Sequence, residues 1–544
     1  MGARYGGQKE QISGAQAMRK LLTTLTALTL VGGVLLGAPV RTLAVGESAV
    51  YWISNASVGA GTSCASPTHE YISGDLTARL NDLLDDILDE VAEEDYASVT
   101  IAICEADDGA QQVYEMDDDT DPEVDVTGAE ITIAGVQWDA TSEADVADAG
   151  DVVIDGNEDY SPFEFNNADV YIGYLTIRDA FDDNAGAAIH FEQDSPGFIF
   201  ELNLDHVVID GAWIDNGNGA GVYAEGSVTI ADSTFTDNSA DNGSGGAVYV
   251  GDAVSVTISD SVFGNPNDDS GCGADYTVTV TNSSFLNNDA DDQGGAISDG
   301  QNDTVSPLTE VIVTGSYFYQ NEADLGAAIN LDGTTLTLSD STFIENHAVD
   351  DGGALELCNN EAVTVTGSRF VGNSSESSGG AIQVNCDTAN LTIESNQFQR
   401  NTTVGQGGAI RVQTGVSGTS ITRNTFIGNS AEQGGAVSIN DGDVDSYLWS
   451  ITRNTFTKNR ATLNGGALHM ALDNSGNVVT PNVKKNRFRG NSAPAAGAVV
   501  VESDYGTERV ILRRYERGLR GNSFQSNRAT SERRSATIGV HFDD

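Results

Sequence analysis

Residues 421–440 read ITRNTFIGNSAEQGGAVSIN, and they contain one copy of the unit that decides the fold. The unit is an alternating strand, then Phe426, then Asn429, and then Gly-Gly-Ala-aliphatic after a short polar gap. Eleven copies occur between Phe235 and Asn527, most of them complete, with a period of roughly 28 residues. A repeat of this length that contains only strand and turn chemistry predicts a solenoid.

The aligned copies share columns of like residues. The position five before each Phe is always aliphatic, and the position two before it is Ser up to Ser368 and Asn from Asn396 onward. Stacked coils place like residues over like at about 4.8 Å, so these columns become continuous ladders. The sequence therefore predicts an all-β, single-stranded parallel β-helix. Its best ladder residues are Phe343, Asn346, Phe370, Asn373, Phe398, Asn401, Phe426 and Asn429.

The Gly-Gly-Ala steps supply positive φ angles and room for the close approach of neighbouring coils. The density of Gly and the period-two alternation, as in Val-Thr-Val-Thr at 278–281, exclude helix from the repeats.

The paired FxxN and GGAI/GGAL/GGAV motifs resemble the repeats of the chlamydial polymorphic outer-membrane proteins and of related right-handed β-helix proteins. One copy departs from the pattern, because Pro266 stands where Asn would follow Phe263. The resemblance covers a little over half of the chain. It implies a right-handed coil and an adhesive protein displayed at the cell surface, associated with an outer membrane.

The first 44 residues have the features of a secretory signal peptide, with Met18 as the expected start. Arg19 and Lys20 precede an uncharged apolar stretch, 21–36, and small residues follow near Ala44. At roughly 16 residues the stretch is short for a membrane anchor, which is the alternative reading. We therefore expect a secreted or cell-surface protein with no transmembrane segment in the mature chain.

Residues 45–125 are predicted to cap the solenoid, which then extends over 126–544 with the FxxN/GGA repeats from about 227. A solenoid needs its open end covered, and a short acidic helix suits that role. Its apolar face would contain Leu80, Leu83, Leu84, Ile87, Leu88 and Val91.

The charge divides the chain. The whole chain contains 81 Asp and Glu residues but 26 Lys and Arg residues, which gives a net charge of -55. Only Arg79 and Arg178 are basic between residues 42 and 368, whereas the chain from Arg369 onward is rich in arginine. The acidic part would repel nucleic acid, and the basic part is the better candidate for an anionic partner. The candidate contacts are Arg513, Arg514, Arg517 and Arg520.

Acidic loops follow the FxxN motifs. Oxygen-only ligand clusters favour Ca²⁺, so Asp289, Asp291, Asp292, Asp350 and Asp351 are candidate Ca²⁺ ligands. No loop fits an EF-hand, and a solvated acidic face explains the same residues. No cofactor is certain, and Ca²⁺ is the one considered.

Five cysteines in an exported chain allow two disulfides. Cys358 and Cys386 lie 28 residues apart at equivalent places in adjacent repeats, so they are expected to face each other. Cys64 and Cys104 could join within the cap, which would leave Cys272 as the odd thiol.

Many β-helices cleave acidic polysaccharides, so an enzyme must be considered. The Gly-His-Gly and Asp-Pro-His motifs of two such families are absent, and the six His are scattered. Arg178, beside Asp179, Asp182 and Asp183, is the one weak catalytic candidate. The sequence favours a non-catalytic, adhesin-like binding or structural rod for an unidentified cell-surface glycan or protein. The alternative is a secreted polysaccharide lyase or hydrolase.

Overall fold

The computed structural model describes residues between Ser48 and Phe542, with gaps. The longer segments outside it are 1–47, 55–68, 71–97, 105–111, 116–122, 137–149, 265–276, 299–309, 441–448, 473–481, 504–518 and 530–537. The predicted signal peptide and capping helix lie outside the described residues. Within the described residues every regular element is a β-strand, and there is no helix long and apolar enough to span a membrane.

The chain divides into two compact units. The N-terminal unit contains residues 1–157, 162–178 and 193–208, and the repeat unit contains 158–161, 179–192 and 209–544.

The N-terminal unit is built on long parallel strands. One register of buried side chains runs through Tyr51, Ile101, Ile133 and Ile172. The strands that lie wholly in this unit are β1 (Ser48–Ser54), β2 (His69–Glu70), β3 (Ser98–Cys104), β4 (Gln112–Glu115), β5 (Glu123–Asp125), β6 (Glu130–Val136), β7 (Val152–Asp155), β8 (Phe163–Asn166) and β9 (Asp169–Arg178). Most of β12 (Glu201–Asp210) belongs to it as well.

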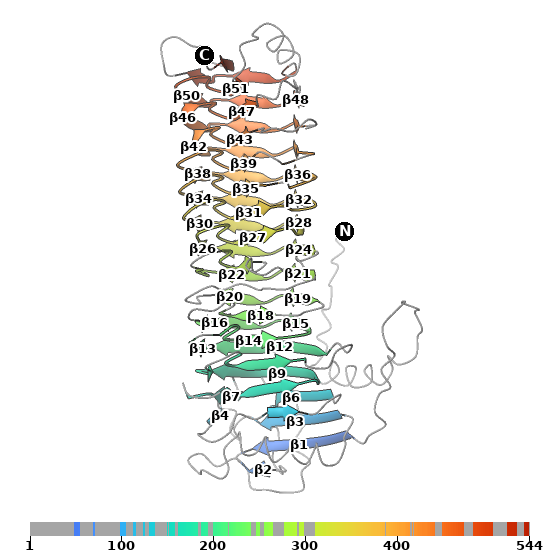
Figure 1. The fold of residues 1–544 in the computed structure, drawn as a ribbon. Helices are drawn as coiled ribbons and strands as arrows, with labels where there is room; N and C mark the ends of the chain where they lie inside the picture. The colour runs from blue at the N-terminus through green and yellow to red at the C-terminus, as the bar shows by residue number, and fades with distance from the viewer. Residues whose placement is uncertain are drawn as a thin grey trace, which may run out of the picture. The chain divides into compact units, whose positions relative to one another are not determined.

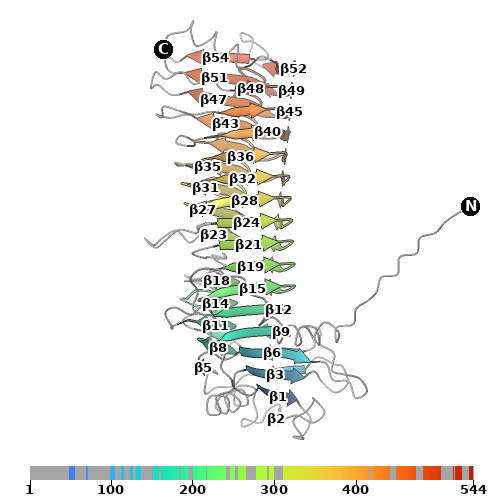
Figure 2. The same ribbon diagram turned by 90° about the vertical axis from the view of Figure 1, so that its right-hand side faces the viewer.

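Each coil of the repeat unit passes through up to four strands, and each strand pairs in parallel with its equivalent in the next coil (Figures 1 and 2). The strand before each Phe forms the aliphatic sheet: β15 (Ser227–Ala231), β19 (Val256–Ser259), β21 (Thr277–Thr281), β24 (Glu310–Thr314), β28 (Thr335–Ser339), β32 (Val363–Thr366), β36 (Leu391–Glu394), β40 (Ser420–Thr422), β44 (Ser450–Thr452) and β48 (Asn482–Lys484).

The strand that contains each Phe forms the Phe sheet: β16 (Thr234–Thr236), β20 (Val262–Gly264), β22 (Ser284–Leu286), β25 (Tyr317–Tyr319), β29 (Thr342–Ile344), β33 (Arg369–Val371), β37 (Gln397–Gln399), β41 (Thr425–Ile427), β45 (Thr455–Thr457), β49 (Arg487–Arg489) and β52 (Ser523–Gln525).

After the FxxN motif, or at the equivalent place in the earlier coils, the chain forms short strands: β10 (Phe181–Asp182), β13 (Trp213–Ile214), β17 (Ser239–Ala240), β26 (Glu322–Ala323), β30 (His347–Ala348), β34 (Ser374–Ser375), β38 (Thr402–Thr403), β42 (Ser430–Gln433), β46 (Arg460–Asn464), β50 (Ser492–Ala493) and β53 (Arg528–Ala529).

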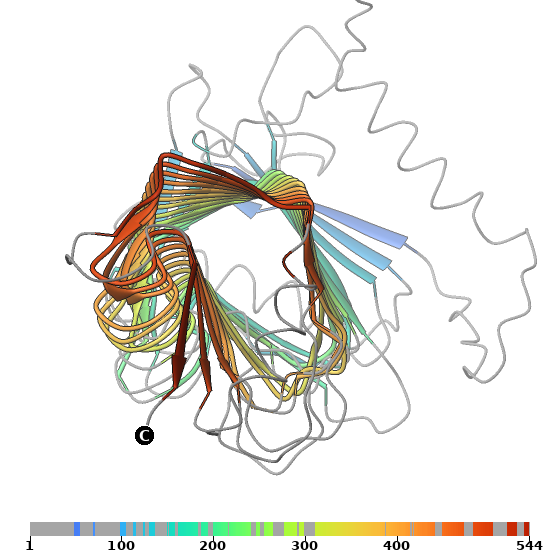
Figure 3. The ribbon, with the colours of Figure 1, turned by 90° about the horizontal axis from the view of Figure 1, so that it is seen from above.

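The strand after Gly-Gly-Ala, or after its equivalent in each coil, forms the post-glycine strands: β11 (Ile189–Glu192), β14 (Val222–Ala224), β18 (Val248–Val250), β23 (Ile297–Ser298), β27 (Ile329–Asp332), β31 (Leu355–Cys358), β35 (Ile382–Val384), β39 (Ile410–Val412), β43 (Val437–Asn440), β47 (Leu468–Leu472), β51 (Val499–Ser503) and β54 (Ile538–Phe542). Seen from above, the coils coloured yellow to red overlie one another (Figure 3). The predicted parallel β-helix is confirmed.

A stack of Phe rings runs inside the repeat unit. From Phe235 to Phe524, successive ring centroids lie 4.5 to 5.0 Å apart, and their planes differ by at most 9°. All of these rings from Phe235 to Phe488 are buried. The stack follows from the backbone register, which pairs each Phe with the next, as Phe398 with Phe426.

Buried Asn side chains form a ladder beside the Phe stack. The Asn401 Nδ2 donates to Asn429 Oδ1 at 3.0 Å and to the Phe370 carbonyl oxygen at 3.1 Å. The Asn401 backbone N–H donates to the same Asn429 oxygen at 3.0 Å. Because each amide satisfies groups in three coils, Asn can be buried here without an unpaired polar atom.

The column two residues before each Phe forms a second ladder, and it explains the switch from Ser to Asn. The Ser341 backbone N–H donates to Ser368 Oγ, and the Ser368 N–H donates to Asn396 Oδ1 at 2.7 Å. Both residue types accept from the preceding N–H. Asn adds a bond along the stack, because Asn396 Nδ2 donates to Asn424 Oδ1 at 3.2 Å.

The Gly-Gly step has a steric cause. Gly407 has a φ of 72°, in the left-handed region that favours Gly. A Cβ on Gly408 would lie 2.4 Å from the Gly435 carbonyl oxygen of the next coil. Both positions therefore favour glycine, although Ala327 occupies the second position in one coil and Ala496, with a φ of 48°, the first position in another.

We predict that Asn401→Ala destabilises the repeat unit by about 3 kcal/mol or more, because several buried polar groups lose their partner. The matched control is Gln397→Ala, an exposed residue in the same coil, which should change stability by less than about 0.5 kcal/mol. Guanidinium denaturation followed by circular dichroism measures both. Equal midpoints for the two variants would contradict a role for the Asn ladder in stability.

Candidate functional site

A column of polar side chains on the post-glycine strands is buried, although alternation would place it on the outer face of the coil. The aliphatic neighbours on each side fill the interior, as Leu355 and Leu357 do around Glu356. Glu356 is 7% exposed, and Gln383 is fully buried. The column continues in register through Asn330, Glu356, Gln383, Arg411, Ser438 and His469.

The residue immediately before each Gly-Gly lies against this column. Gln383 Nε2 donates to Asp351 Oδ2 at 3.4 Å, and Ser438 Oγ donates to Gln406 Oε1 at 3.2 Å. Arg411 likewise donates to Ser378 Oγ at 2.9 Å. Each bond joins one coil to the next. We call the two facing columns the polar seam: Asn330, Glu356, Gln383, Arg411, Ser438 and His469 on the strands, and Asp351, Ser378, Gln406 and Gln433 before the glycines.

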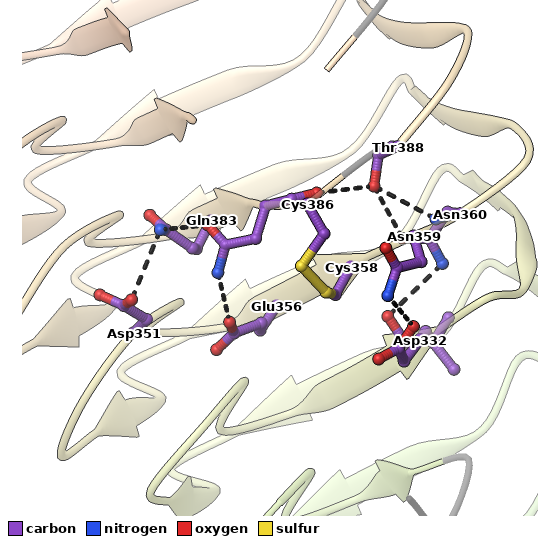
Figure 4. The surroundings of a disulfide bond; sticks show 11 residues. Asp332, Asp351, Glu356, Cys358, Asn359, Asn360, Gln383, Cys386 and Thr388 are labelled. Carbon is purple, nitrogen blue, oxygen red and sulfur yellow. Dashed lines mark hydrogen bonds between the residues drawn. A yellow bond between two sulfur atoms is a disulfide. The ribbon is translucent and has the colours of Figure 1, made fainter. Parts of the chain in front are cut away.

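The acidic end of the polar seam is tightly hydrogen-bonded on one side (Figure 4). Asn385 Nδ2 donates to Glu356 Oε1 at 2.7 Å, and Gln383 Nε2 donates to Asn385 Oδ1 at 2.7 Å. Four buried atoms here have no hydrogen-bond partner: Asp351 Oδ1, Glu356 Oε2, Gln383 Oε1 and Arg411 Nε. Such atoms carry a desolvation cost that the Asn ladder avoids.

Burial changes the ionisation of the seam. Burial is the main reason that the pKa of Glu356 is raised to about 8; the nearby carboxylates of Asp351, Asp350 and Asp332 contribute to the rise, and the hydrogen bond from Asn385 opposes it. Burial also raises the pKa of Asp351, although the hydrogen bond from Ser377 and the Arg411 charge oppose this. Glu356 is therefore mainly neutral at pH 7. A protonated carboxyl can act as a general acid, but Glu356 is buried, which favours a structural role.

Next to the polar seam, a disulfide joins Cys358, at the end of β31, to Cys386 in the next coil (Figure 4). Their Cα atoms are 5.1 Å apart. Cys104 in the N-terminal unit is also disulfide-bonded. Its partner lies outside the described residues, as do both Cys64 and Cys272.

Among the described candidate Ca²⁺ ligands, Asp289 lies apart from Asp350 and Asp351. Asp289 pairs with Glu322, and Glu322 pairs in turn with His347. Asp350 follows in that third coil, so it lies two coils from Asp289, roughly 10 Å along the stack. One ion cannot contact both. Asp291 and Asp292 lie outside the described residues.

Arg178, the weak catalytic candidate, is engaged in an ion pair within the N-terminal unit. Its Nε donates to Asp155 Oδ2 at 2.9 Å, and its Nη2 contacts the same oxygen. Its sequence neighbours gave no signal for this pairing, which depends on the parallel register of β7 and β9.

A basic surface follows the later coils of the Phe sheet. The residue three before each Phe lies at the corner between two strands and has a φ in the left-handed region. This residue is Asp232 and Asp260 in the first coils, but Arg453 and Lys485 in the last ones. The residue two after Phe456 is likewise Lys458, with a φ of 57°. We define the basic face as Arg453, Lys458, Lys484, Lys485, Arg487 and Arg489, all exposed. Arg513, Arg514, Arg517 and Arg520 lie outside the described residues.

Comparison with known proteins agrees with this fold. Residues 218–398 match a family described as "Right handed beta helix region". Together with the parallel coils, this match defines the chain as a β-helix repeat protein. The finer likeness to the chlamydial repeats remains a prediction.

Individual relatives are distant. The chain is 27% identical over 220 residues to metabotropic glutamate receptor-like protein R of Dictyostelium discoideum, a match that covers 39% of this chain and 12% of that protein. Two structures of PfbA, a surface adhesin of Streptococcus pneumoniae, align with 77% and 86% of this chain and with 91% and 97% of their own. Their identities are 13% and 12% and their TM-scores 0.24 and 0.23. Scores this low leave the function open.

We predict that Glu356 makes stability fall with rising pH. Its pKa is raised from 4.5 to about 8 on folding, so its stabilising contribution is complete below about pH 4.5 and is lost as the pH rises through about 8. Thermal melting at pH 5 and pH 9 measures this. At pH 9, Glu356→Gln should be more stable than the wild type by about 2 kcal/mol or more.

The control for this experiment is Glu376→Gln, which removes an exposed carboxylate of the next coil. It should keep the wild-type dependence on pH. A Glu356→Gln protein with the same pH dependence as the wild type would show that Glu356 is ionised in the folded state.

We predict that the double variant Cys358→Ala/Cys386→Ala loses about 3 kcal/mol of stability, because the disulfide closes a 28-residue loop in the unfolded chain. Differential scanning calorimetry under oxidising conditions measures the change and leaves the disulfide of Cys104 intact. An unchanged melting temperature would rule out a stabilising role for this bridge.

Proposed function

We propose that this β-helix repeat protein is exported and acts outside the cell or at its surface as an adhesin-like binding or structural protein, without catalysis. The observation that supports this best is that the repeated residues are buried. The Phe and Asn columns are buried and stack on their equivalents in the next coil, and the aliphatic column fills the interior. The residues left to vary between coils face outward, where they can contact a partner.

Two features support export. Residues 1–44 have the pattern of a signal peptide, and the Cys358–Cys386 disulfide suits an oxidising compartment. Association with an outer membrane rests on the chlamydial resemblance and is part of the proposal.

The polar seam argues against the enzymatic alternative. A polysaccharide lyase or hydrolase needs an acid and a base that the polymer can reach together. Glu356 has the raised pKa of an acid, but it is only 7% exposed. A glycan chain cannot reach it without opening the coil.

Binding to the surface of the native cells tests the proposal, together with an assay for cleavage. Purified full-length protein should be retained on washed cells. It should release no reducing or unsaturated ends from pectin, alginate or sulfated glycans. Release at enzymatic rates, reduced by Glu356→Gln, would overturn the non-catalytic function and support a lyase or hydrolase.

A further inference from the structure

The late coils of the repeat unit concentrate positive charge on one part of the surface. The described stretches 418–440, 449–472 and 482–503 contain eight basic residues, and their only acidic residues are Glu432 and Glu502. By contrast, the described stretch 310–386 contains Arg369 as its only basic residue. The change of sign therefore occurs within one continuous stack of coils.

The register places these charges over one another. The Arg453 N–H donates to the Lys484 carbonyl oxygen, so Lys485 turns the same corner as Arg453 in the next coil. Arg423 turns it in the coil before, since its N–H donates to the Thr452 carbonyl oxygen. Three cations thus stack at a spacing of about 4.8 Å, the distance between parallel strands. Like charges stacked directly destabilise a sheet, so folding alone does not favour this column.

Only the first of these three cations is neutralised within the described residues. Arg423 forms an ion pair with Glu394 of the preceding coil. In the described part of the chain, Arg453, Lys458, Lys484, Lys485, Arg487 and Arg489 have no carboxylate within salt-bridge distance. Arg487 and Arg489 project from β49 on either side of buried Phe488, so the rigid Phe stack holds them in place.

We propose that the basic face, formed by Arg453, Lys458, Lys484, Lys485, Arg487 and Arg489, binds an acidic polysaccharide through its sulfate or carboxylate groups. The inference rests on the proposed function as a binding protein and names the class of its partner. Arginine suits paired contacts with planar or tetrahedral anions, and lysine adds charge. Thr452, Thr455 and Thr457 lie between the cations and supply hydroxyl groups for a sugar.

The same face is poorly suited to other polyanions. Its outward residues on β45 and β49 are Thr and Arg, with no aromatic ring on which a nucleic acid base could stack. Phe456 and Phe488, the large apolar residues on these strands, are buried and cannot insert into a membrane. An extended acidic sugar polymer fits a polar, positively charged and rigid surface.

The experiment uses the full-length protein and two probes, dextran sulfate for sulfate groups and polygalacturonate for carboxylates, with neutral dextran as the control polymer. Affinity is measured by biolayer interferometry between 50 mM and 500 mM NaCl. We expect binding to at least one acidic polymer, none to dextran, and weakening with salt. Lys484→Gln/Lys485→Gln/Arg487→Gln/Arg489→Gln should reduce the affinity at least about tenfold.

The control removes two exposed positive charges outside the basic face, in Arg369→Gln/Arg400→Gln. It should keep more than half of the affinity, and circular dichroism melting verifies that both variants fold. The proposal is overturned if neither acidic polymer binds, if only the control variant loses binding, or if single-stranded DNA or phosphatidylserine vesicles bind as tightly as the polysaccharides. Retention on cells is scored separately. If the protein binds neither acidic polymer but is still retained on cells, the basic face is refuted and the proposed function is not.

Discussion

The repeat unit depends on one constraint, the parallel pairing of each strand with its equivalent one coil later. Because the pairing keeps its register, every side chain meets the same position of the next coil at about 4.8 Å. Positions that stack well on themselves are therefore repeated, as the Phe rings from Phe235 to Phe524 and the buried Asn amides are. The same constraint penalises charges that repeat, which is why the late corner column of Arg423, Arg453 and Lys485 needs an explanation beyond folding.

The polar seam shows a second way to join coils. The Asn ladder satisfies its amides completely, whereas the seam at Asp351, Glu356, Gln383 and Arg411 leaves buried atoms unpaired. The Cys358–Cys386 disulfide lies beside this part of the seam. A covalent bond between two coils offsets part of the cost of a neighbouring site that is poorly satisfied. Stability and ionisation are thus coupled in these coils.

The surface charge of the repeat unit varies independently of its interior. The stacked interior is almost the same in every coil, while the outward residues change from acidic to basic. A change of sign costs the fold little, because outward side chains of one strand do not alter the ladders beneath them. The repeat unit can therefore vary its surface without changing its architecture, as repeat proteins that bind partners do.

The sequence by itself determined the coil, since Phe, Asn and Gly-Gly-Ala at one period are compatible with few other arrangements. It also indicated that Cys358 and Cys386 are equivalent, because their spacing is one period. Only the tertiary structure decided that Glu356, Gln383 and His469 are buried, since strand alternation predicts an outward face. The pairing of Arg178 with Asp155 and the stacking of Arg453 under Lys485 likewise required the register between coils, which fixes contacts that no single repeat contains.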